Sequence, residues 1–195
     1  ETWGLPVWCK LSFEGNQISD KWLEEFSKMI GETWGLPVWC KLSFEENQIS
    51  DKWLKEFSKI LGGTCGLPVW CKLNFGVNYI RDKWLKEFSK IIAETWGLPA
   101  WCKLNFGVNY IREKWLEEFS KMIGETWGLP VWCTLNFTMN EFSHKWLKEF
   151  SKMIGETWGL PAGCKLIFIH NQIWDKWKKI LKQLNKRYPE ITILF

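Results

Sequence analysis

The chain repeats itself at a fixed interval of 31 residues, and this periodicity constrains its fold more than any other feature. The six copies span residues 1–31, 32–62, 63–93, 94–124, 125–155 and 156–186. The sixth copy departs from the pattern after Asp175, and residues 187–195 are predicted to form a C-terminal capping strand. Residues 1–195 are therefore predicted to form a single array with a diverged last copy, and we expect a further cap or domain before the first copy.

Each copy contains two hydrophobic periods in succession. The segment "VWCKLSF" alternates apolar and polar residues from Val7 to Phe13, which predicts a short strand with one buried face. The segment "ISDKWLEEFSKMIG" follows the helical period and predicts an amphipathic helix, with Ser19 and Asp20 capping its start and Gly31 ending it. The predicted apolar stripe comprises Ile18, Trp22, Phe26, Met29 and Ile30. Each helix returns the chain to the same end, so the strands are predicted to be parallel.

A single strand–helix unit cannot bury both of its apolar faces, so neighbouring copies are expected to stack. The predicted fold is an α/β solenoid, with a parallel sheet on its concave face and helices on its convex face. A closed strand–helix barrel is the alternative. Six units would be few for a barrel, and the alternation within each strand fits a sheet with one solvent-exposed face better.

The framework residues of the copies resemble those of a known repeat family. Each copy follows the pattern Trp-x-x-Leu-x-Phe-x-x-Asn-x-Ile, apart from Phe142 in the last place of the fifth copy and Gly163 in the first place of the sixth. This pattern resembles the leucine-rich-repeat segment LxxLxLxxNxL, with Trp and Phe in two Leu places. The continuation "NQISDKWLKEFSKIL" is similar to the helical part of the ribonuclease-inhibitor type. The resemblance implies a horseshoe-shaped solenoid.

The Asn of this pattern is assigned a structural role. The backbone turns inward where the strand ends, so its buried polar groups need partners, which an amide stacked on the amide of the next copy could supply. The column comprises Asn16, Asn47, Asn78, Asn109, Asn140 and Asn171. A Trp-rich framework also permits sugar or base stacking. Trp8, Trp22 and their equivalents occupy framework or stripe positions, and we assign them to the core.

Composition narrows the possible functions. The chain is 46% hydrophobic and 17% aromatic, which is enough for a sizeable core. Its 26 basic and 22 acidic residues are interspersed, without the basic block typical of nucleic-acid binding. No apolar run approaches the roughly 18 residues that a membrane span needs, and no signal peptide is visible. We therefore expect neither nucleic acid nor membrane as a partner.

Chemically reactive residues form no catalytic or metal-binding pattern. Six of the seven Cys recur once per copy, and Cys65 stands where the other copies have Trp. The recurring ones are Cys9, Cys40, Cys71, Cys102, Cys133 and Cys164. Without a CxxC pair or a Cys/His cluster, they are interpreted as a column of buried reduced thiols, which favours an intracellular, cytoplasmic location. His144 and His170 are the only histidines, so we expect no enzyme, no metal and no cofactor.

The differences between copies gather in one window. The second and fourth copies differ at ten positions, and six of these lie between Ser43 and Asp51. The alternative explanation is free drift of exposed positions. Exposed residues of "DKWLKEFSK" hardly change, however, and drift should affect them equally. The window is therefore interpreted as a ligand-contacting surface.

The predicted partner-binding surface collects the variable and charged positions of the concave face and its edge. It comprises Lys10, Glu14, Lys41, Glu45, Glu46, Lys72, Asn74, Tyr79, Arg81, Lys103, Asn105, Tyr110, Arg112, Glu141, His170 and Trp174. Its character changes from acidic near the N-terminus, through Tyr and Arg, to apolar. Tyr and Arg are residues that often dominate binding energy.

Two functions from different classes remain open. The first is a non-catalytic module that recognises a protein or peptide, as a monomer or with weak end-to-end self-association. The second is a structural repeat array, natural or designed, without a specific ligand, which could assemble end to end. Nucleic-acid binding is a distant third, because acidic residues lie beside the Lys column.

Overall fold

The computed structural model describes residues 5–32, 35–52, 57, 67–94, 98–112, 114, 119, 130–143, 150–151 and 162–195. Seven strands of three residues each lie in this part of the chain. They are β1 (Lys10–Ser12), β2 (Lys41–Ser43), β3 (Lys72–Asn74), β4 (Lys103–Asn105), β5 (Thr134–Asn136), β6 (Lys165–Ile167) and β7 (Thr192–Leu194). The described helices are α1 (Asp20–Glu32), α3 (Asp82–Glu94) and α6 (Asp175–Arg187).

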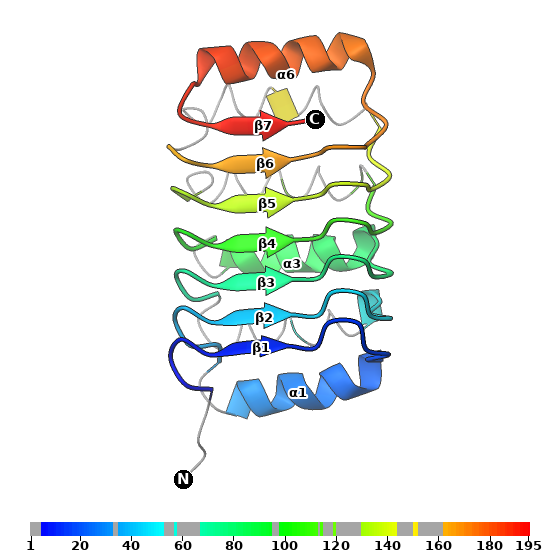
Figure 1. Ribbon diagram of the computed structural model, residues 1–195, viewed down its shortest axis with the longest axis vertical. Helices are drawn as coiled ribbons and strands as arrows, with labels where there is room; N and C mark the ends of the chain where they lie inside the picture. Colours follow the sequence, from blue (N-terminus) through cyan, green and yellow to red (C-terminus); the bar gives the residue numbers. More distant parts are fainter. Residues whose placement is uncertain are drawn as a thin grey trace.

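The strands form one open, all-parallel sheet in the order β1 to β7, as Figure 1 shows. Equivalent positions of successive copies pair directly, so that Lys10 lies opposite Lys41 and Lys41 opposite Lys72. Residues that pair in the sheet are therefore 31 positions apart, the same interval as the sequence repeat. The prediction of parallel strands is confirmed, and the closed barrel is excluded because β1 and β7 are free edges.

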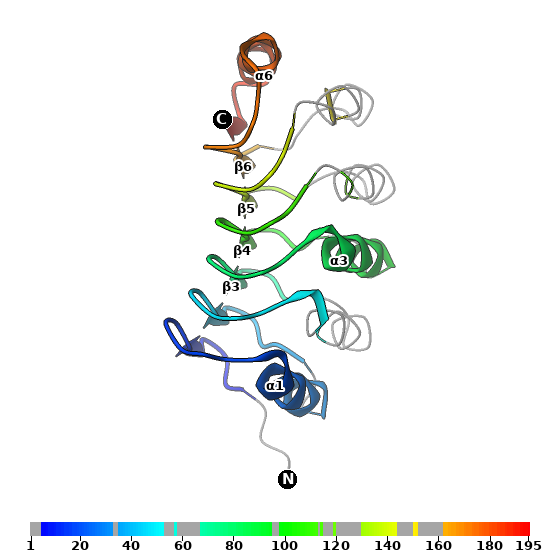
Figure 2. The same cartoon turned by 90° about the vertical axis from the view of Figure 1, so that its right-hand side faces the viewer.

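Helices α1 and α3 lie on one side of the sheet, α6 lies over its C-terminal end beyond β7, and the other face of the sheet is open (Figure 2). This α/β arrangement is compatible with a repeat solenoid. At the C-terminal end, the side chain of Asn185 on α6 both donates to and accepts from the backbone of Ile193 in β7, at 2.8 Å each. Within the described residues, no helix is both long and apolar enough to cross a membrane.

The core lies between the sheet and the helices and is built from columns of identical side chains. The Phe that follows each strand stacks on its equivalent in the next copy, with ring centroids 5.3 Å apart for Phe13 and Phe44 and 5.6 Å apart for Phe44 and Phe75. Behind the first strands, Leu23 and Ile30 of α1 are completely buried. Each such side chain contributes about 1.5–3 kcal/mol by leaving water.

The predicted apolar stripe of the helix is wrong for two of its members. In α1 the buried residues are Leu23, Phe26, Ser27 and Ile30. Trp22 and Met29 are 42% and 43% exposed. Leu23, Phe26 and Ile30 follow the i, i+3, i+7 spacing of one helical face, which leaves Trp22 at the edge of that face. There its ring stacks on Phe26 at 5.4 Å and covers the flank of the core.

The predicted helix ends also need correction. The helix continues through Gly31 to Glu32, one residue beyond the predicted stop. Asp20 begins the helix, but its carboxylate binds the next copy. Its oxygens accept from the Ser50 backbone N–H at 3.1 Å and from the Ser50 hydroxyl at 2.6 Å. Asp82 accepts in the same way from the backbone N–H of Arg112, at 2.6 Å. These carboxylates connect copies and satisfy the backbone of the neighbouring loop.

The strand begins later than predicted, and the Trp that precedes it is not in the core. The Cys9 N–H donates to the Pro6 carbonyl at 3.1 Å, and Trp8 has a positive φ of 69°, as in the third position of a type II turn. Val7 and Trp8 therefore occupy a turn and are 53% and 65% exposed. The prediction of a strand from Val7 and of a buried Trp8 is wrong, because the alternation of apolar residues extended into turn positions.

The turn Trp residues of successive copies stack on one another along the edge of the sheet. We call this column the Trp ladder; it comprises Trp8, Trp39, Trp70, Trp101 and Trp132. Successive ring centroids lie 4.3, 4.3, 4.2 and 5.0 Å apart. Stacking of this kind stabilises each pair by about 0.5–1.5 kcal/mol beyond the buried area.

Candidate functional site

Asn side chains connect the loops that follow the strands. The Asn78 amide donates to the Phe44 carbonyl of the preceding copy at 2.9 Å, and within its own loop to Phe75 at 3.2 Å and Gly76 at 2.9 Å. Its Oδ1 accepts the backbone N–H of Ile49 at 3.0 Å. Asn47, Asn109, Asn140 and Asn171 make the equivalent four bonds.

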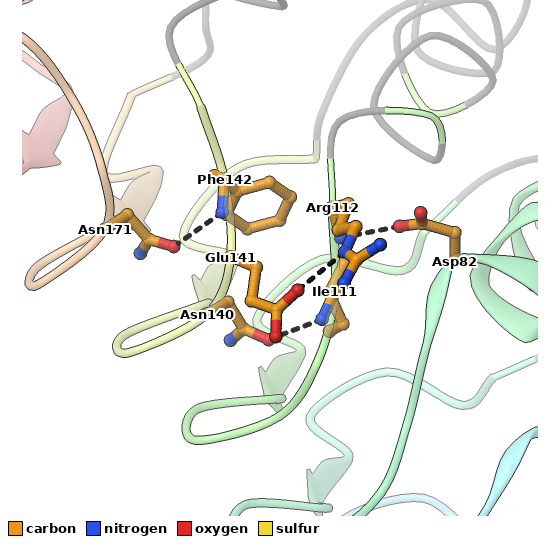
Figure 3. A network of polar contacts seen from close by, with 7 residues as sticks. All are labelled: Asp82, Ile111, Arg112, Asn140, Glu141, Phe142 and Asn171. Atoms are coloured by element: carbon orange, nitrogen blue, oxygen red, sulfur yellow. Dashed lines mark hydrogen bonds and ion pairs between the residues drawn. The ribbon is translucent and has the colours of Figure 1, made fainter.

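The structural role predicted for this Asn column is confirmed, because the amides are the partners of backbone N–H and carbonyl groups in the loops. The amides bind backbone groups of two copies, and the equivalent amides do not bind each other. In Figure 3, Asn140 and Asn171 each reach the backbone of the preceding loop, at Ile111 and Phe142. Asn16 is exposed, and its partners within the described part of the chain are those of its own loop, Phe13 and Glu14. We call the column of Asn side chains that bond to the preceding loop the Asn ladder; it comprises Asn47, Asn78, Asn109, Asn140 and Asn171. It holds successive loops at a fixed spacing, so that the outward residues of these loops form a continuous edge.

A groove runs across these loops at the C-terminal ends of the strands, on the right-hand side of Figure 1. We call it the rim groove. It has a volume of about 530 Å³, and the Asn ladder forms its floor. Its outward side chains are Glu46, Val77, Tyr79, Val108, Tyr110, Met139 and Glu141. Most of its wall is therefore apolar or aromatic, although it faces solvent.

Three apolar residues of the rim groove are held in a strained backbone conformation. Val77, Val108 and Met139 have φ values of 53°, 54° and 53°, and they are 38%, 41% and 51% exposed. The left-handed region costs a non-Gly residue about 1–3 kcal/mol, and β-branched Val is a rare occupant of it. The first copy has Gly15 at this place, with φ 67°. Both the backbone strain and the exposed apolar surface lower the stability of the fold, so the need to fold does not explain why these residues are present.

Aromatic and charged side chains adjoin these positions. Tyr79 and Tyr110 stack with their ring centroids 6.1 Å apart and their planes inclined by 5°. The Arg81 guanidinium lies 6.0 Å from the centre of the Tyr110 ring. Arg112 donates from Nε to Glu141 Oε2 at 2.6 Å, and Figure 3 shows this pair beside the Asn ladder. Arg112 is thus neutralised by Glu141, whereas Arg81 has no ion pair among the described residues.

The open face of the sheet carries a row of lysines. We call it the Lys ladder; it comprises Lys10, Lys41, Lys72 and Lys103, followed by Thr134 and then Lys165. Of these side chains, those from Lys10 to Thr134 line a depression of about 550 Å³. Partial burial lowers the pKa of Lys72, and the charges of Lys103 and Lys41 lower it further. Like charges placed directly opposite each other destabilise a sheet, so this row favours anionic groups.

The next column on the open face is occupied with internal hydrogen bonds. Asn105 donates to Asn74 Oδ1 at 2.7 Å, and Asn74 donates to Glu45 Oε2 at 2.8 Å and to Ser43 Oγ at 3.2 Å. Asn74 Oδ1 also accepts the backbone N–H of Gly76. Glu45, Asn74 and Asn105, which are among the predicted partner contacts, form a hydrogen-bonded network between neighbouring copies, and their contact with a partner stays a prediction.

The structure divides the predicted partner-binding residues into separate places. The open sheet face carries the lysines together with Glu14, Glu45, Asn74 and Asn105. The loop edge carries Glu46, Tyr79, Arg81, Tyr110, Arg112, Glu141 and His170. Trp174 occupies the repeat position of Arg81 and Arg112 in the sixth copy and is 64% exposed, directly before the start of α6. Val77, Val108 and Met139 occupy the same repeat position as Glu46 and His170 and lie on this edge, although they were not among the predicted contact residues. Their apolar character within a solvent-facing loop was the signal that could have found them.

The cysteines form a buried column behind the Trp ladder. The six recurring thiols are buried, and none of them is in a disulfide. Burial raises the pKa of Cys40 to about 12, with a smaller contribution from Cys9. Cys133 and Cys164 lie 3.2 Å apart at sulfur. The predicted burial is confirmed for these six, and Cys65 lies outside the described residues.

The expectation of a non-catalytic chain stays a prediction. Within the described part of the chain, no three His, Cys, Asp or Glu residues come together in a way that could hold a metal ion. His144 falls outside that part, and His170 lies exposed in a loop with φ 58°.

Comparison with known protein families and with curated proteins gives no match. The likeness to leucine-rich repeats therefore rests on the repeat pattern, the parallel sheet and the Asn ladder.

Proposed function

We propose that the chain is a non-catalytic recognition module that binds a protein or peptide segment across the rim groove and the adjoining sheet face. In this proposal the fold is a leucine-rich-repeat solenoid of the ribonuclease-inhibitor type, with six strand–helix repeats and the sheet on its concave side. The observation that carries the proposal is the placement of Val77, Val108 and Met139 in strained, exposed positions beside two stacked tyrosines.

A purely structural array has no use for these side chains. The loop needs a residue that accepts a positive φ, and Gly15 in the first copy satisfies this requirement without strain. Val or Met in the same place costs stability and exposes apolar surface. Strained residues that persist in this way cluster at binding sites, where a partner covers them.

The groove indicates the size and chemistry of the segment it would hold. It crosses four neighbouring loops, which at a strand spacing of about 4.8 Å span roughly 14 Å. An extended peptide of about four or five residues covers this length at about 3.3 Å per residue. Its apolar or aromatic side chains would lie on Val77, Tyr79, Val108 and Tyr110. Acidic side chains beside them would meet Arg81 or the Lys ladder.

Selection from a random peptide display library against the full chain tests this proposal. We expect selected peptides to combine aromatic or aliphatic residues with acidic ones. Their affinity should fall at least tenfold in the double variant Tyr79→Ala/Tyr110→Ala, because paired aromatic residues commonly dominate interface energy.

The matched control is Val38→Ala/Val69→Ala. Both side chains are exposed and apolar, they lie in the turns before the strands, and Ala stands at the equivalent position 100. This control should leave the affinity unchanged. A library that yields no enriched peptide, or peptides that bind the Tyr79→Ala/Tyr110→Ala variant equally well, would favour the ligand-free structural array.

A further inference from the structure

Two departures from the repeat pattern lie side by side at the N-terminal ends of β5 and β6. Gly163 stands in the Trp place of the sixth copy, and Thr134 stands in the Lys place of the fifth. Both line one cavity of about 470 Å³, which we call the β5–β6 pocket. It lies at the opposite ends of the strands from the rim groove, so it is a separate site.

The Trp132 side chain occupies part of the space that the missing Trp of the sixth copy leaves beside Gly163. A Cβ on Gly163 would lie 2.3 Å from Cε3 of Trp132, so the Trp132 ring lies directly over the Gly163 backbone. The ring has also moved from the regular stack, with its centroid 5.0 Å from that of Trp101. Trp132 remains 49% exposed and gives the pocket an aromatic wall.

The opposite side of the pocket is positively charged. Thr134 replaces a lysine between Lys103 and Lys165, which leaves room between two ammonium groups two strands apart. Neither ammonium has an ion-pair partner among the described residues. Glu190 follows Gly163 in the ladder, where its carbonyl accepts the Gly163 N–H at 2.7 Å, and it contributes one negative charge to the lining. The pocket therefore carries two positive charges and one negative charge.

We propose that the β5–β6 pocket binds a small organic anion that carries a flat ring. The ring packs against the exposed part of the Trp132 side chain, and the anionic group lies between Lys103 and Lys165. The cavity volume falls within the range of about 300–1,000 Å³ that small-molecule sites occupy. Glu190 repels part of the anion's charge, so the site discriminates by charge as well as by shape.

Calorimetric titration of the full chain with 1-naphthyl phosphate tests the proposal. The expected result is saturable binding at one site with a dissociation constant of about 1 mM or below. The neutral analogue 1-naphthol keeps the ring without the anionic group, and inorganic phosphate keeps the anion without the ring. Both should bind at least tenfold more weakly than 1-naphthyl phosphate. Absence of saturable binding, or equal binding of 1-naphthol, would overturn the proposal.

Charge variants locate the anion. Lys103→Thr/Lys165→Thr should weaken binding of 1-naphthyl phosphate at least tenfold, whereas Glu190→Gln should strengthen it about threefold. The matched control is Lys41→Thr, the same change on the same ladder but outside the pocket. Its affinity should equal that of the wild type at 150 mM salt. If Lys41→Thr and Lys103→Thr/Lys165→Thr weaken binding equally, the pocket is not the site.

A shape variant tests the pocket without removing charge. Gly163→Trp restores the repeat pattern at a position whose φ of 73° is close to that of the other ladder residues. Because an added Cβ would lie 2.3 Å from Cε3 of Trp132, we expect the new side chain to displace the Trp132 ring, fill the pocket and abolish binding, with folding checked by circular dichroism. Undiminished binding in a folded Gly163→Trp protein would overturn the proposal. If this variant does not fold, the charge variants decide the question.

Discussion

The Oδ1 atom of Asn78 lies 3.0 Å from the backbone nitrogen of Ile49, one copy earlier in the chain. The same side chain binds the Phe44 carbonyl of that earlier copy, so one amide closes the interface between two neighbouring loops. Because both loops are buried at these atoms, loss of the amide leaves several polar groups without partners.

We therefore expect Asn78→Ala to lower the free energy of unfolding by about 3 kcal/mol, which is the cost of leaving a buried N–H and buried carbonyls unpaired. Asn16→Ala is the control, because Asn16 is exposed and, among the described residues, bonds to its own loop. It should cost less than about 1 kcal/mol. Urea unfolding measures both values, and equal losses would contradict the role assigned to the ladder between copies.

The strain of the rim groove predicts a reciprocal pair of stability changes. Val77→Gly removes a left-handed β-branched residue, which releases about 1–2 kcal/mol, while the greater freedom of Gly in the unfolded chain offsets about 0.5–1 kcal/mol. The net expectation is stabilisation by about 0.5–1 kcal/mol. Gly15→Val should destabilise by a similar amount, because the nearest atom to an added Cβ is 3.9 Å away and only the backbone opposes the change. Thermal unfolding of both variants measures these changes. Destabilisation by Val77→Gly together with stabilisation by Gly15→Val would contradict the claim that this position is strained.

The buried thiols predict a loss of stability at alkaline pH. Burial raises the pKa of Cys40 from 9.0 to about 12, so the neutral thiol is favoured in the folded state. The resulting stabilisation is complete below pH 9 and is lost between pH 9 and 12, since only the unfolded thiol ionises in that window. At pH 10.5 the loss is about 2 kcal/mol for this residue.

The measurement is urea unfolding at pH 7 and pH 10.5 under reducing conditions, for the wild type and for Cys40→Ala. Between the two pH values the wild type should lose about 2 kcal/mol more than the variant, because the other ionisable groups are common to both. Identical losses would show that Cys40 does not titrate in this way.

The ion pair between Arg112 and Glu141 is expected to matter little for stability. Both side chains are solvent-accessible, and exposed pairs contribute about 0–1 kcal/mol. Arg112→Gln should therefore change the free energy of unfolding by less than about 0.5 kcal/mol. Its backbone N–H retains the bond to Asp82. A loss above 2 kcal/mol in urea unfolding would mean that the pair has a structural role.

The sequence predicted those parts of the fold that depend on periodicity. Copies 31 residues apart pair in register because identical residues at identical spacing leave one way to align them, as with Leu42 opposite Leu73. The Asn column was predicted because a buried loop needs hydrogen-bond partners. Each amide also bonds to the loop of the preceding copy. Those bonds depend on the distance between neighbouring loops, which cannot be read from the sequence.

The positions that sequence reasoning misplaced are those where local conformation overrides the hydrophobic pattern. Trp8 is apolar and in phase with the strand, yet a turn with positive φ directs it to the sheet edge. Val77 and Val108 follow a Gly in "FGVN", and their apolar character is visible in the sequence, but their positive φ is not. Their strain exists only in the three-dimensional loop, so the most informative part of the candidate site required the structure.

The affinity of a peptide selected on the wild type, measured by calorimetry against Val77→Gly/Val108→Gly, tests the central claim most directly. The claim is that these strained apolar residues are kept for recognition. It predicts that the variant is at least as stable as the wild type and binds the peptide at least tenfold more weakly. An unchanged dissociation constant in the stabilised variant would contradict it.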